Sequence, residues 1–165
     1  MDYTWHCASP LGRITLASDG AALVGLWFDG QAHFGRGISP EQEERLTPDM
    51  ETAVLWLDAY FAGEQPGFEP PVAPRGTDFQ RAVWAALREI PYGQTSTYGE
   101  LARSLAGRGW PRASARAVGG AVARNPISLI VPCHRVLGAR GALTGYAGGV
   151  ERKAKLLELE KAAGA

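Results

Sequence analysis

The chain contains the stretch Asn125-Pro126-Ile127-Ser128-Leu129-Ile130-Val131-Pro132-Cys133-His134-Arg135-Val136, in which an apolar run leads to a cysteine. The run from Leu129 to Val131, entered from Ile127, predicts a short buried strand, so that Cys133 lies where a rigid element ends. Cysteine reacts as the thiolate, and at its ordinary pKa of about 8.5 only a few per cent is ionised near pH 7. A following histidine and arginine would favour ionisation. The residue types leave two interpretations open, a nucleophile or a small buried apolar side chain.

Length and composition are those of an ordinary globular protein. The chain has 165 residues, of which 45% are hydrophobic and 21% charged, enough for one large domain or two small ones. No apolar run reaches the length of a membrane span, and the amino-terminal region lacks a signal pattern. The two cysteines, Cys7 and Cys133, indicate neither a disulfide framework nor a metal-ligand spacing. A cytoplasmic location without a membrane partner is therefore expected.

The two halves of the chain carry opposite charge. Residues 1–72 hold three Lys/Arg and eleven Asp/Glu, a net charge of −8, whereas residues 73–165 hold fourteen and six, a net charge of +8. No acid occurs between Glu100 and Glu151, a region that includes Cys133. Its arginines are Arg103, Arg108, Arg112, Arg116, Arg124, Arg135 and Arg140. This pattern favours a polyanionic partner, with a solvated basic surface as the alternative.

The first half predicts a small α/β unit. Residues 2–7, 13–18 and 22–28 predict three strands joined by tight turns, which gives an antiparallel meander. Residues 29–46 predict mostly loop. Thr47-Pro48-Asp49 predicts the start of a helix that Gly63 ends. The proline-rich segment 66–76 predicts a stiff linker, so we divide the chain into domains 1–72 and 73–165. No residue of the first domain is a candidate for catalysis.

Helices dominate the second half. Two capping boxes, Thr77-Asp78-Phe79-Gln80 and Thr97-Tyr98-Gly99-Glu100, predict helices that end before Pro91 and at Gly107. A third helix is expected from about Arg112 to Arg124. The last two helices are compatible with a helix-turn-helix, although many helix pairs of a protein core look the same.

The third helix has one face that is nearly bare. Its positions Ala113, Ala117, Gly120 and Ala121 lie on one side, and glycine inside a helix costs about 1 kcal/mol relative to alanine. Close approach by another element explains such a face, and that element is either a neighbouring helix or DNA. A helix with ordinary side chains is about 10–12 Å across, whereas the DNA minor groove is about 6 Å wide. A bare face with arginines at its edges would suit that groove.

Three features follow the cysteine. Residues 136–144 predict a hairpin with Arg140 at its tip, which after a helix-turn-helix would be the wing of a winged-helix domain. The segment Gly145-Tyr146-Ala147-Gly148-Gly149 predicts a flexible loop suited to lining a pocket. A last helix is expected from Val150 to about Ala163, with Glu160 near its end.

These motifs together resemble the O6-alkylguanine-DNA alkyltransferases, also called methylated-DNA–protein-cysteine methyltransferases. The likeness rests on Asn125 to Val136, on Arg116-Ala117-Val118-Gly119-Gly120 and on the segment from Gly145 to Glu160, and the bacterial single-protein type is most similar. Its specific part covers Arg75 to Glu160. The resemblance implies a ribonuclease-H-like α/β amino-terminal domain, a small antiparallel sheet plus a helix, followed by a mostly α winged helix-turn-helix domain.

The activity that the resemblance implies is direct reversal of DNA damage. Members of the family bind duplex DNA in the minor groove, flip the O6-alkylated guanine into a pocket, and transfer the alkyl group once and irreversibly to their own cysteine. The partner would be double-stranded DNA containing O6-alkylguanine. The protein would be a monomer without cofactor or metal, and cooperative binding to DNA stays open.

The family pattern also implies catalytic roles for residues of this sequence. Cys133 would be the nucleophile and alkyl acceptor, His134 its base through a water, and Glu160 the group that holds His134. A carboxylate beside the imidazole would favour imidazolium and hence a thiolate. Asn125 would brace the cysteine turn, and Tyr98 would hydrogen-bond the guanine.

Further residues are implied for the pocket and the DNA surface. The pocket would be lined by Tyr98, Val136, Tyr146 and Ala147, and the carbonyls of Cys133 and Val136 would accept from the guanine amino group. DNA would be contacted by Ser96, Thr97, Arg116, Ala117, Gly120, Ala121, Arg124 and Arg140. Arg116 would enter the base stack where the flipped guanine leaves.

The sequence departs from the family pattern in three places. Ala147 stands where some members have serine, which removes a hydroxyl but not a backbone N–H. The turn Gly107-Arg108-Gly109-Trp110-Pro111 is longer than is usual between the two DNA-facing helices. His6, Cys7 and His33 do not reproduce the zinc-ligand pattern of some eukaryotic members, so no metal is expected.

Two other functions are compatible with parts of the sequence. A non-catalytic DNA-binding module of the same fold would need no cysteine, and related alkyltransferase-like proteins replace it, so Cys133 favours chemistry. A cysteine hydrolase could use Cys133 and His134, but it would not need a bare helix with arginines at its edges.

Overall fold

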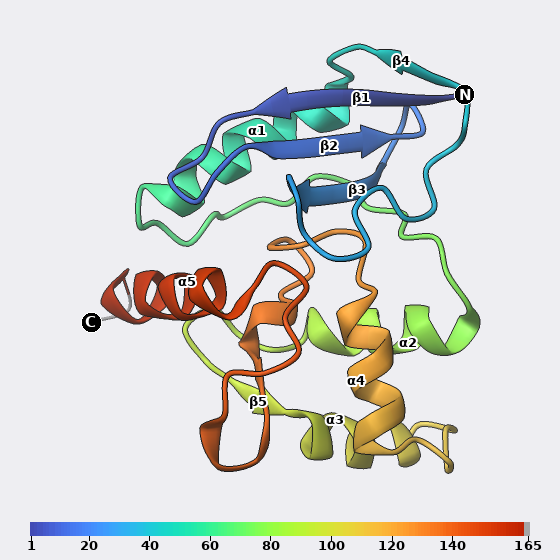
Figure 1. The fold of residues 1–165 in the computed structure, drawn as a ribbon, viewed down its shortest axis with the longest axis vertical. Helices are drawn as coiled ribbons and strands as arrows, with labels where there is room; N and C mark the ends of the chain where they lie inside the picture. Colours follow the sequence, from blue (N-terminus) through green and yellow to red (C-terminus); the bar gives the residue numbers. More distant parts are fainter. Residues whose placement is uncertain (164–165) are drawn as a thin grey trace.

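The amino-terminal half forms one small sheet covered by a helix, in a computed structural model that describes residues 1–163 (Figure 1). Strands β1 (Asp2–Cys7), β2 (Ile14–Ser18), β3 (Leu23–Phe28) and β4 (Gln42–Glu44) lie in the order β3-β2-β1-β4. The first three pair antiparallel through tight turns, as predicted. β4 pairs parallel with β1, so the sheet is mixed, and the loop expected over residues 29–46 contains a strand. Its three residues are all exposed and polar and therefore show no alternation.

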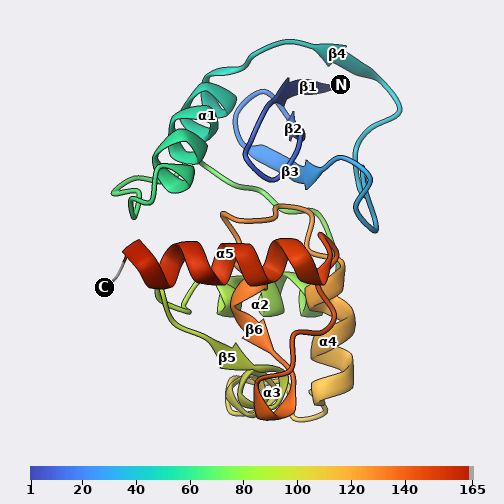
Figure 2. The same ribbon diagram turned by 60° about the vertical axis from the view of Figure 1, so that its left-hand side comes forward.

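Helix α1 (Pro48–Phe61) packs against the sheet and begins after Thr47, with proline at its first position, as predicted. Its buried residues include Met50, Leu57 and Tyr60. Figure 2 shows that one end of α1 points toward the carboxy-terminal part of the chain, near helix α5 (Val150–Ala163).

The proline-rich linker is attached to the sheet. Leu23 of β3 donates to Pro71 O (2.8 Å) and accepts from Ala73 N (2.7 Å), which holds the linker along the strand. Arg75 then makes two hydrogen bonds to the buried carboxylate of Asp2, at 2.6 and 2.9 Å. The Arg75 guanidinium lowers the pKa of Asp2. These contacts fix the linker on the amino-terminal half.

Within residues 73–163 the chain forms the α-helices α2 (Asp78–Leu87), α3 (Tyr98–Ala106), α4 (Ala115–Ala123) and α5 (Val150–Ala163). The capping box at Thr77 forms in both directions. At Thr97 only half of it forms, because the Glu100 carboxylate accepts from Ser96 instead of the cap backbone. No helix in residues 1–163 combines the length and the apolar character that crossing a membrane requires.

Helix α4 starts later than expected. It begins at Ala115 rather than Arg112, because the Ser114 hydroxyl accepts from Ala117 N and acts as the N-cap. α4 packs against α3 and α2 as a helix-turn-helix, and Trp84 of α2 donates its indole N–H to Ala121 O (2.8 Å). One hydrophobic core joins both halves of the chain, with α5 at their junction (Figure 2).

Two strand predictions near the cysteine were wrong. Residues 128–130 form a turn, with Leu129 at φ 71°, and Ile127 makes only an isolated bridge to Leu26 of β3. The run is buried, but a short apolar run does not by itself distinguish a strand from a packed turn. Cys133 accordingly opens a 3-10 turn, η1 (Cys133–Arg135), rather than ending a strand.

The predicted wing hairpin does not form a two-stranded ladder either. β6 (Val136–Leu137) pairs in parallel with β5 (Ser96–Thr97), just before α3, and residues 142–144 are in no strand. The loop is closed by Gly138 N donating to Ala142 O (2.8 Å). Residues 96–97, which are distant in sequence, thus pair with Val136–Leu137, where the predicted hairpin would have placed residues 142–144.

Candidate active site

The turn that carries Cys133 rests on strand β3. Leu26 donates to Pro126 O (2.8 Å) and accepts from Ser128 N (3.0 Å), so the segment after α4 pairs with the edge of the amino-terminal sheet. The side chain of Asn125 closes the turn from inside, because Nδ2 donates to Val131 O (2.9 Å) and Oδ1 accepts from Ile127 N (3.0 Å). The structure thus gives Asn125 the contacts of the bracing residue that the sequence predicts.

Cys133 is 3% exposed and lies beside polar groups from several elements. Burial raises the pKa of its thiol to about 11, although the nearby Asn125 amide and Lys153 ammonium act in the opposite direction. Such a group is a thiol at neutral pH. The expectation of a thiolate in the resting protein is therefore wrong, because the desolvation of a buried sulfur outweighs its favourable neighbours.

The Glu160 carboxylate of α5 accepts hydrogen bonds from four donors. Oε2 accepts from Tyr60 OH (2.6 Å) and His134 Nε2 (2.5 Å), and Oε1 accepts from Arg135 Nε (2.8 Å) and Gly93 N (3.0 Å). Burial opposes ionisation of this carboxyl, but the hydrogen bonds outweigh it and hold the pKa of Glu160 at about 2. Glu160 is thus a buried carboxylate at every physiological pH.

His134 is completely buried and held by Glu160. Burial lowers the pKa of His134, and the Glu160 carboxylate only partly compensates, so the imidazole is neutral at pH 7 rather than the expected imidazolium. With Nε2–H donating to Glu160, Nδ1 is the acceptor nitrogen, and it has no hydrogen-bond partner among residues 1–163. An unoccupied imidazole nitrogen is what a base acting on a thiol through a water requires.

The loop after the cysteine wraps around two tyrosines. Tyr146 is buried, and a Cβ at Gly148 would lie 2.5 Å from its ring, so only glycine fits there. Tyr98 donates to Thr144 O (2.9 Å), and a Cβ at Gly145, which has φ +74°, would lie 2.7 Å from its hydroxyl. Burial raises the pKa of both tyrosines, and a negative charge on Cys133, once its thiol ionises, raises it further. Both rings therefore belong to the surroundings of the sulfur.

The backbone carbonyls of the remaining pocket residues already accept hydrogen bonds from groups of this chain. Val136 is buried and its carbonyl accepts from Lys153 Nζ, while Cys133 O accepts from Val136 N. Ala147 O accepts from Ala32 N (3.1 Å), which ties the loop to the amino-terminal half. Each carbonyl oxygen has a second lone pair, so these bonds leave room for one further donor.

Sequence reasoning missed two residues of this site. Tyr60 comes from α1, in the half where no catalytic candidate was expected, and no local pattern distinguishes it from a core aromatic. Lys153 is fully buried and its ammonium donates to Val136 O and to Thr144 O (2.9 Å). A signal for Lys153 does exist, since it is spaced three and seven residues from the buried Leu156 and Glu160 on the same helix face.

The outer face of α4 is bare. Arg116 and Ala117 are exposed and Gly120 is half-buried, whereas Ala121 is buried against α2 and cannot face a ligand without unfolding. A Cβ at Gly120 would meet only the Arg124 guanidinium, at 3.6 Å, so no packed protein neighbour requires that glycine. Within residues 1–163 helix packing therefore explains Ala121 but does not explain Gly120.

The other residues expected to contact DNA differ in how free they are. Thr97 uses its hydroxyl as a helix cap and Ser96 donates to Glu100. Arg124 donates back to Gly120 O (2.9 Å), and Arg140 lies exposed in the loop after β6. Of the other arginines, Arg135 is turned inward to Glu160 and Arg108 pairs with Glu89, so neither adds to the free basic surface.

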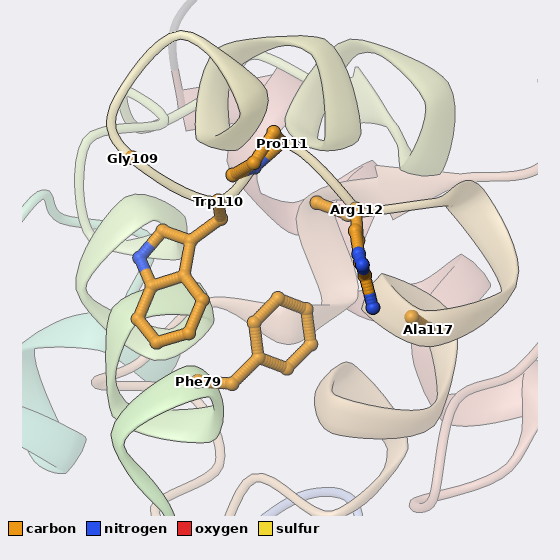
Figure 3. Close-up of a pocket in the computed structure, with 7 residues that line it drawn as sticks. Phe79, Gly109, Trp110, Pro111, Arg112 and Ala117 are labelled. Atoms are coloured by element: carbon orange, nitrogen blue, oxygen red, sulfur yellow. The ribbon is translucent and has the colours of Figure 1, made fainter.

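A separate apolar pocket of about 380 Å³ lies beside the first turn of α4. Figure 3 shows the rings of Trp110 and Phe79 on one side and Arg112 and Ala117 on the other. The two rings meet edge to face with centroids 5.3 Å apart. Trp110 thus anchors the long turn between α3 and α4 to α2, and the pocket is distinct from the surroundings of Cys133.

The fold and this geometry define a class, namely proteins with a helix-turn-helix whose buried cysteine stands beside a histidine–glutamate pair. Residues 78–162 match the family profile described as "6-O-methylguanine DNA methyltransferase, DNA binding domain", and residues 3–74 match its "ribonuclease-like domain". The chain belongs to the methylated-DNA–protein-cysteine methyltransferases, the O6-methylguanine DNA methyltransferases that repair alkylated DNA.

Similar proteins support this assignment over almost the whole chain. The methylated-DNA–protein-cysteine methyltransferase of Methanosarcina barkeri is 57% identical over 154 residues, which are 93% of each chain. That of Mycobacterium tuberculosis is 49% identical over 93% of this chain and 88% of its own. A crystal structure of the M. tuberculosis protein in complex with DNA is similar with a TM-score of 0.83 and 46% identity, covering 98% of this chain and 93% of that one.

Proposed function

We propose that Cys133 is the residue that takes the alkyl group from O6 of guanine, in a single irreversible transfer, after the base has been flipped out of duplex DNA through the minor groove. The observation that carries this is the surroundings of Cys133, a buried thiol next to a neutral histidine held by a carboxylate with four donors. We further propose that the chain has two domains, the amino-terminal α/β domain 1–72 and the DNA-binding and active-site domain 73–165.

The thiol proton leaves toward His134 Nδ1 through a water, because that nitrogen is the acceptor of the imidazole. The sulfur then bonds to the alkyl carbon as the O6–carbon bond breaks, and the electron pair of that bond stays on the guanine. The guanine anion that leaves takes up a proton from the Tyr98 hydroxyl, which exchanges Thr144 O for the base, and the proton held by His134 returns to the tyrosine oxygen through solvent. In the net reaction one proton thus moves from the thiol to the guanine. The thioether has no leaving group as good as the purine, so the protein does not turn over.

Lys153 acts on the same step by its charge. Its ammonium lowers the pKa of Cys133, although less than burial raises it, and it also holds the carbonyls of Val136 and Thr144. Asn125 acts similarly through the turn that it braces. We assign both as positioning residues that favour the thiolate as it forms.

The partner proposed is double-stranded DNA containing O6-alkylguanine, bound by a monomer in the cytoplasm without cofactor or metal. The DNA-facing surface is the bare face of α4 with Ala117 and Gly120, flanked by Arg116 and Arg124 and extended by Arg140. Arg116 fills the space that the flipped base leaves. This offsets an unstacking cost of a few kcal/mol. Ser96 contributes through its backbone, since its hydroxyl donates to Glu100, whereas the Thr97 hydroxyl accepts from Glu100 N and keeps its O–H free for a phosphate.

The test is single-turnover repair of a duplex with one O6-methylguanine by the protein, its Cys133→Ser variant and its Cys7→Ser variant. We expect stoichiometric loss of O6-methylguanine with the native protein and Cys7→Ser, and none with Cys133→Ser. Binding to the duplex should fall steeply with salt, because phosphate contacts dominate affinity. Repair by Cys133→Ser, or catalytic turnover by the native protein, would overturn the proposal.

A further inference from the structure

Tyr60 reaches the active site from the amino-terminal half of the chain. It is fully buried on α1, where its ring stacks on Trp56 with centroids 5.1 Å apart. Its edge contacts include the His134 ring at 6.4 Å and the Tyr92 ring at 6.2 Å. Its hydroxyl donates to Glu160 Oε2 at 2.6 Å, across a separation of 100 residues. This contact crosses from α1 to α5.

We propose that Tyr60 is a positioning residue of the transfer reaction, whose hydroxyl holds Glu160 Oε2 so that the carboxylate stays ionised and the His134 proton stays on Nε2. The inference rests on the proposed function, since it gives the Glu160–His134 pair a task in alkyl transfer. It assigns part of the active site to the amino-terminal half, which otherwise only supports the cysteine turn.

The geometry at Oε2 carries the argument. This oxygen accepts from two donors, Tyr60 OH and His134 Nε2, whereas Arg135 and Gly93 both bind the other oxygen. Without the tyrosine hydroxyl, His134 would be the one remaining donor to Oε2 among the described residues. The carboxylate would then be more basic and would pull the Nε2 proton toward itself. Nδ1 would become more basic in turn, because the two nitrogens share one ring.

The hydroxyl is a dependable donor. Burial and the charge of Glu160 raise the pKa of Tyr60 above its already alkaline ordinary value, so the hydroxyl keeps its proton at neutral pH. Its oxygen is 3.4 Å from His134 Nε2, too far and too crowded to compete for the histidine proton. Tyr60 therefore stabilises one protonation state of the pair rather than serving as a base.

The experiment compares Tyr60→Phe with Tyr92→Phe. Both changes remove one buried hydroxyl and keep the ring, and the two rings pack edge to face. The Tyr92 hydroxyl has no hydrogen-bond partner within residues 1–163, so it is a matched control. We measure the single-turnover rate constant for methyl transfer from pH 5 to 9 and the Kd for duplex DNA, after checking the thermal unfolding of each variant.

For Tyr60→Phe we expect the acidic limb of the pH profile to move up by about one pH unit, because the more basic Nδ1 of His134 stays protonated to higher pH. The Kd for DNA should stay at the native value, because Tyr60 lies inside the molecule. Tyr92→Phe should follow the native profile. Equal profiles for the two variants, or a lower rate without any shift in pH, would make Tyr60 a merely structural residue.

A second measurement does not depend on methyl transfer. NMR titration of the His134 imidazole in the DNA-free protein should give a higher pKa in Tyr60→Phe and an unchanged pKa in Tyr92→Phe. Adding Tyr60→Phe to a Glu160→Gln background should cause no further shift, because the effect passes through the carboxylate. A shift that persists in that background overturns the inference. Failure of the native protein to transfer methyl would instead overturn the proposed function.

Discussion

At the scale of single residues, the proposed nucleophile Cys133 is protonated in the DNA-free protein. Burial alone would leave Cys133 inert, and His134 is neutral rather than cationic, so neither residue is charged at rest. Among the described residues, the full charges that act on them are the Glu160 carboxylate and the Lys153 and Arg135 cations. Under the proposed function, ionisation of the sulfur is coupled to the arrival of the alkylated base, which would limit side reactions of the thiol.

This account predicts when a thiolate appears. In the DNA-free protein we expect the ultraviolet absorbance of thiolate assigned to Cys133 to rise near pH 11, as the difference between the native protein and Cys133→Ser. The reason is desolvation of the buried sulfur, which raises the pKa of Cys133. A thiolate signal already present at pH 7 and absent in Cys133→Ser would contradict a protonated resting state.

The residues near Cys133 in sequence could be predicted, and those distant from it could not. Asn125 and His134 are local to the motif, and the structure gives both the contacts expected of them. Tyr60 joins the site only because α1 packs next to α5, and its sequence context is that of an ordinary core aromatic. A contact over 100 residues leaves no trace in local spacing.

At the scale of elements, the glycines inside α4 lower the stability of this helix, and we propose that they allow DNA to approach its backbone closely. Gly119 and Gly120 lie in its middle, and a Cβ at Gly120 has room. Substituting Gly120→Ala should therefore raise the free energy of unfolding by up to about 1 kcal/mol. The same methyl group should weaken binding to duplex DNA, because it lies on the face of α4 that is proposed to enter the minor groove.

Urea unfolding and DNA binding of Gly120→Ala test this pair of effects together. Ala117→Gly serves as the complementary change, which should cost stability while leaving the face bare. Tighter DNA binding by Gly120→Ala would contradict the proposal that the bare face of α4 contacts DNA.

Arg116→Ala should reduce repair of O6-methylguanine in duplex DNA about tenfold or more, while transfer from the free alkylated base changes little. The physical reason is that Arg116 is needed only where a base has left its stack. Arg108→Ala is the matched control, because Arg108 is already paired with Glu89 on the surface. Equal losses on duplex and free base would make Arg116 a general structural residue.

Elements with explicit end signals were predicted best. The helices that begin at Thr77 and Thr97 start where their capping residues indicate. The strand at 129–131 and the hairpin at 136–144 were wrong, because β3 and β5 supplied the partners that local sequence could not reveal. α4 began three residues late because Ser114, not a residue before Arg112, is the cap.

At the scale of the whole molecule, the two halves form one unit around the cysteine turn. Strand β3 pairs with residues 126–128, Ala32 holds the loop at Ala147, and Arg152 of α5 donates to Leu11 O (2.9 Å). Residues of both halves pack in one hydrophobic core, so the acidic half contributes to the stability of the basic half. The charge asymmetry was visible in sequence, but this mutual support was not.

His134, Glu160 and Cys133 together make their largest contribution to the free energy of unfolding between about pH 6.5 and pH 9. His134 and Glu160 have lowered pKa values in the folded state, so their contribution is present at neutral pH. It is lost as pH falls below 6.5 for His134 and from 4.5 toward 2 for Glu160. Cys133 has a raised pKa, so its contribution is present below pH 9 and is lost toward pH 11.

Urea unfolding at a series of pH values measures how the free energy of unfolding falls on the acidic side and on the alkaline side. Cys133→Ser should flatten the alkaline limb by about 3 kcal/mol between pH 9 and pH 11, and should leave the acidic limb unchanged. An alkaline limb identical in the variant would mean that the sulfur is ionised or hydrated in the folded state.

The central claim is that one sulfur of this chain takes the alkyl group. The most direct measurement is peptide mass mapping after complete reaction with a duplex that contains O6-methylguanine. The account predicts that the peptide containing Cys133 gains one methyl group per protein molecule and that the peptide containing Cys7 is unchanged. A repaired duplex with an unmodified Cys133 peptide would contradict it.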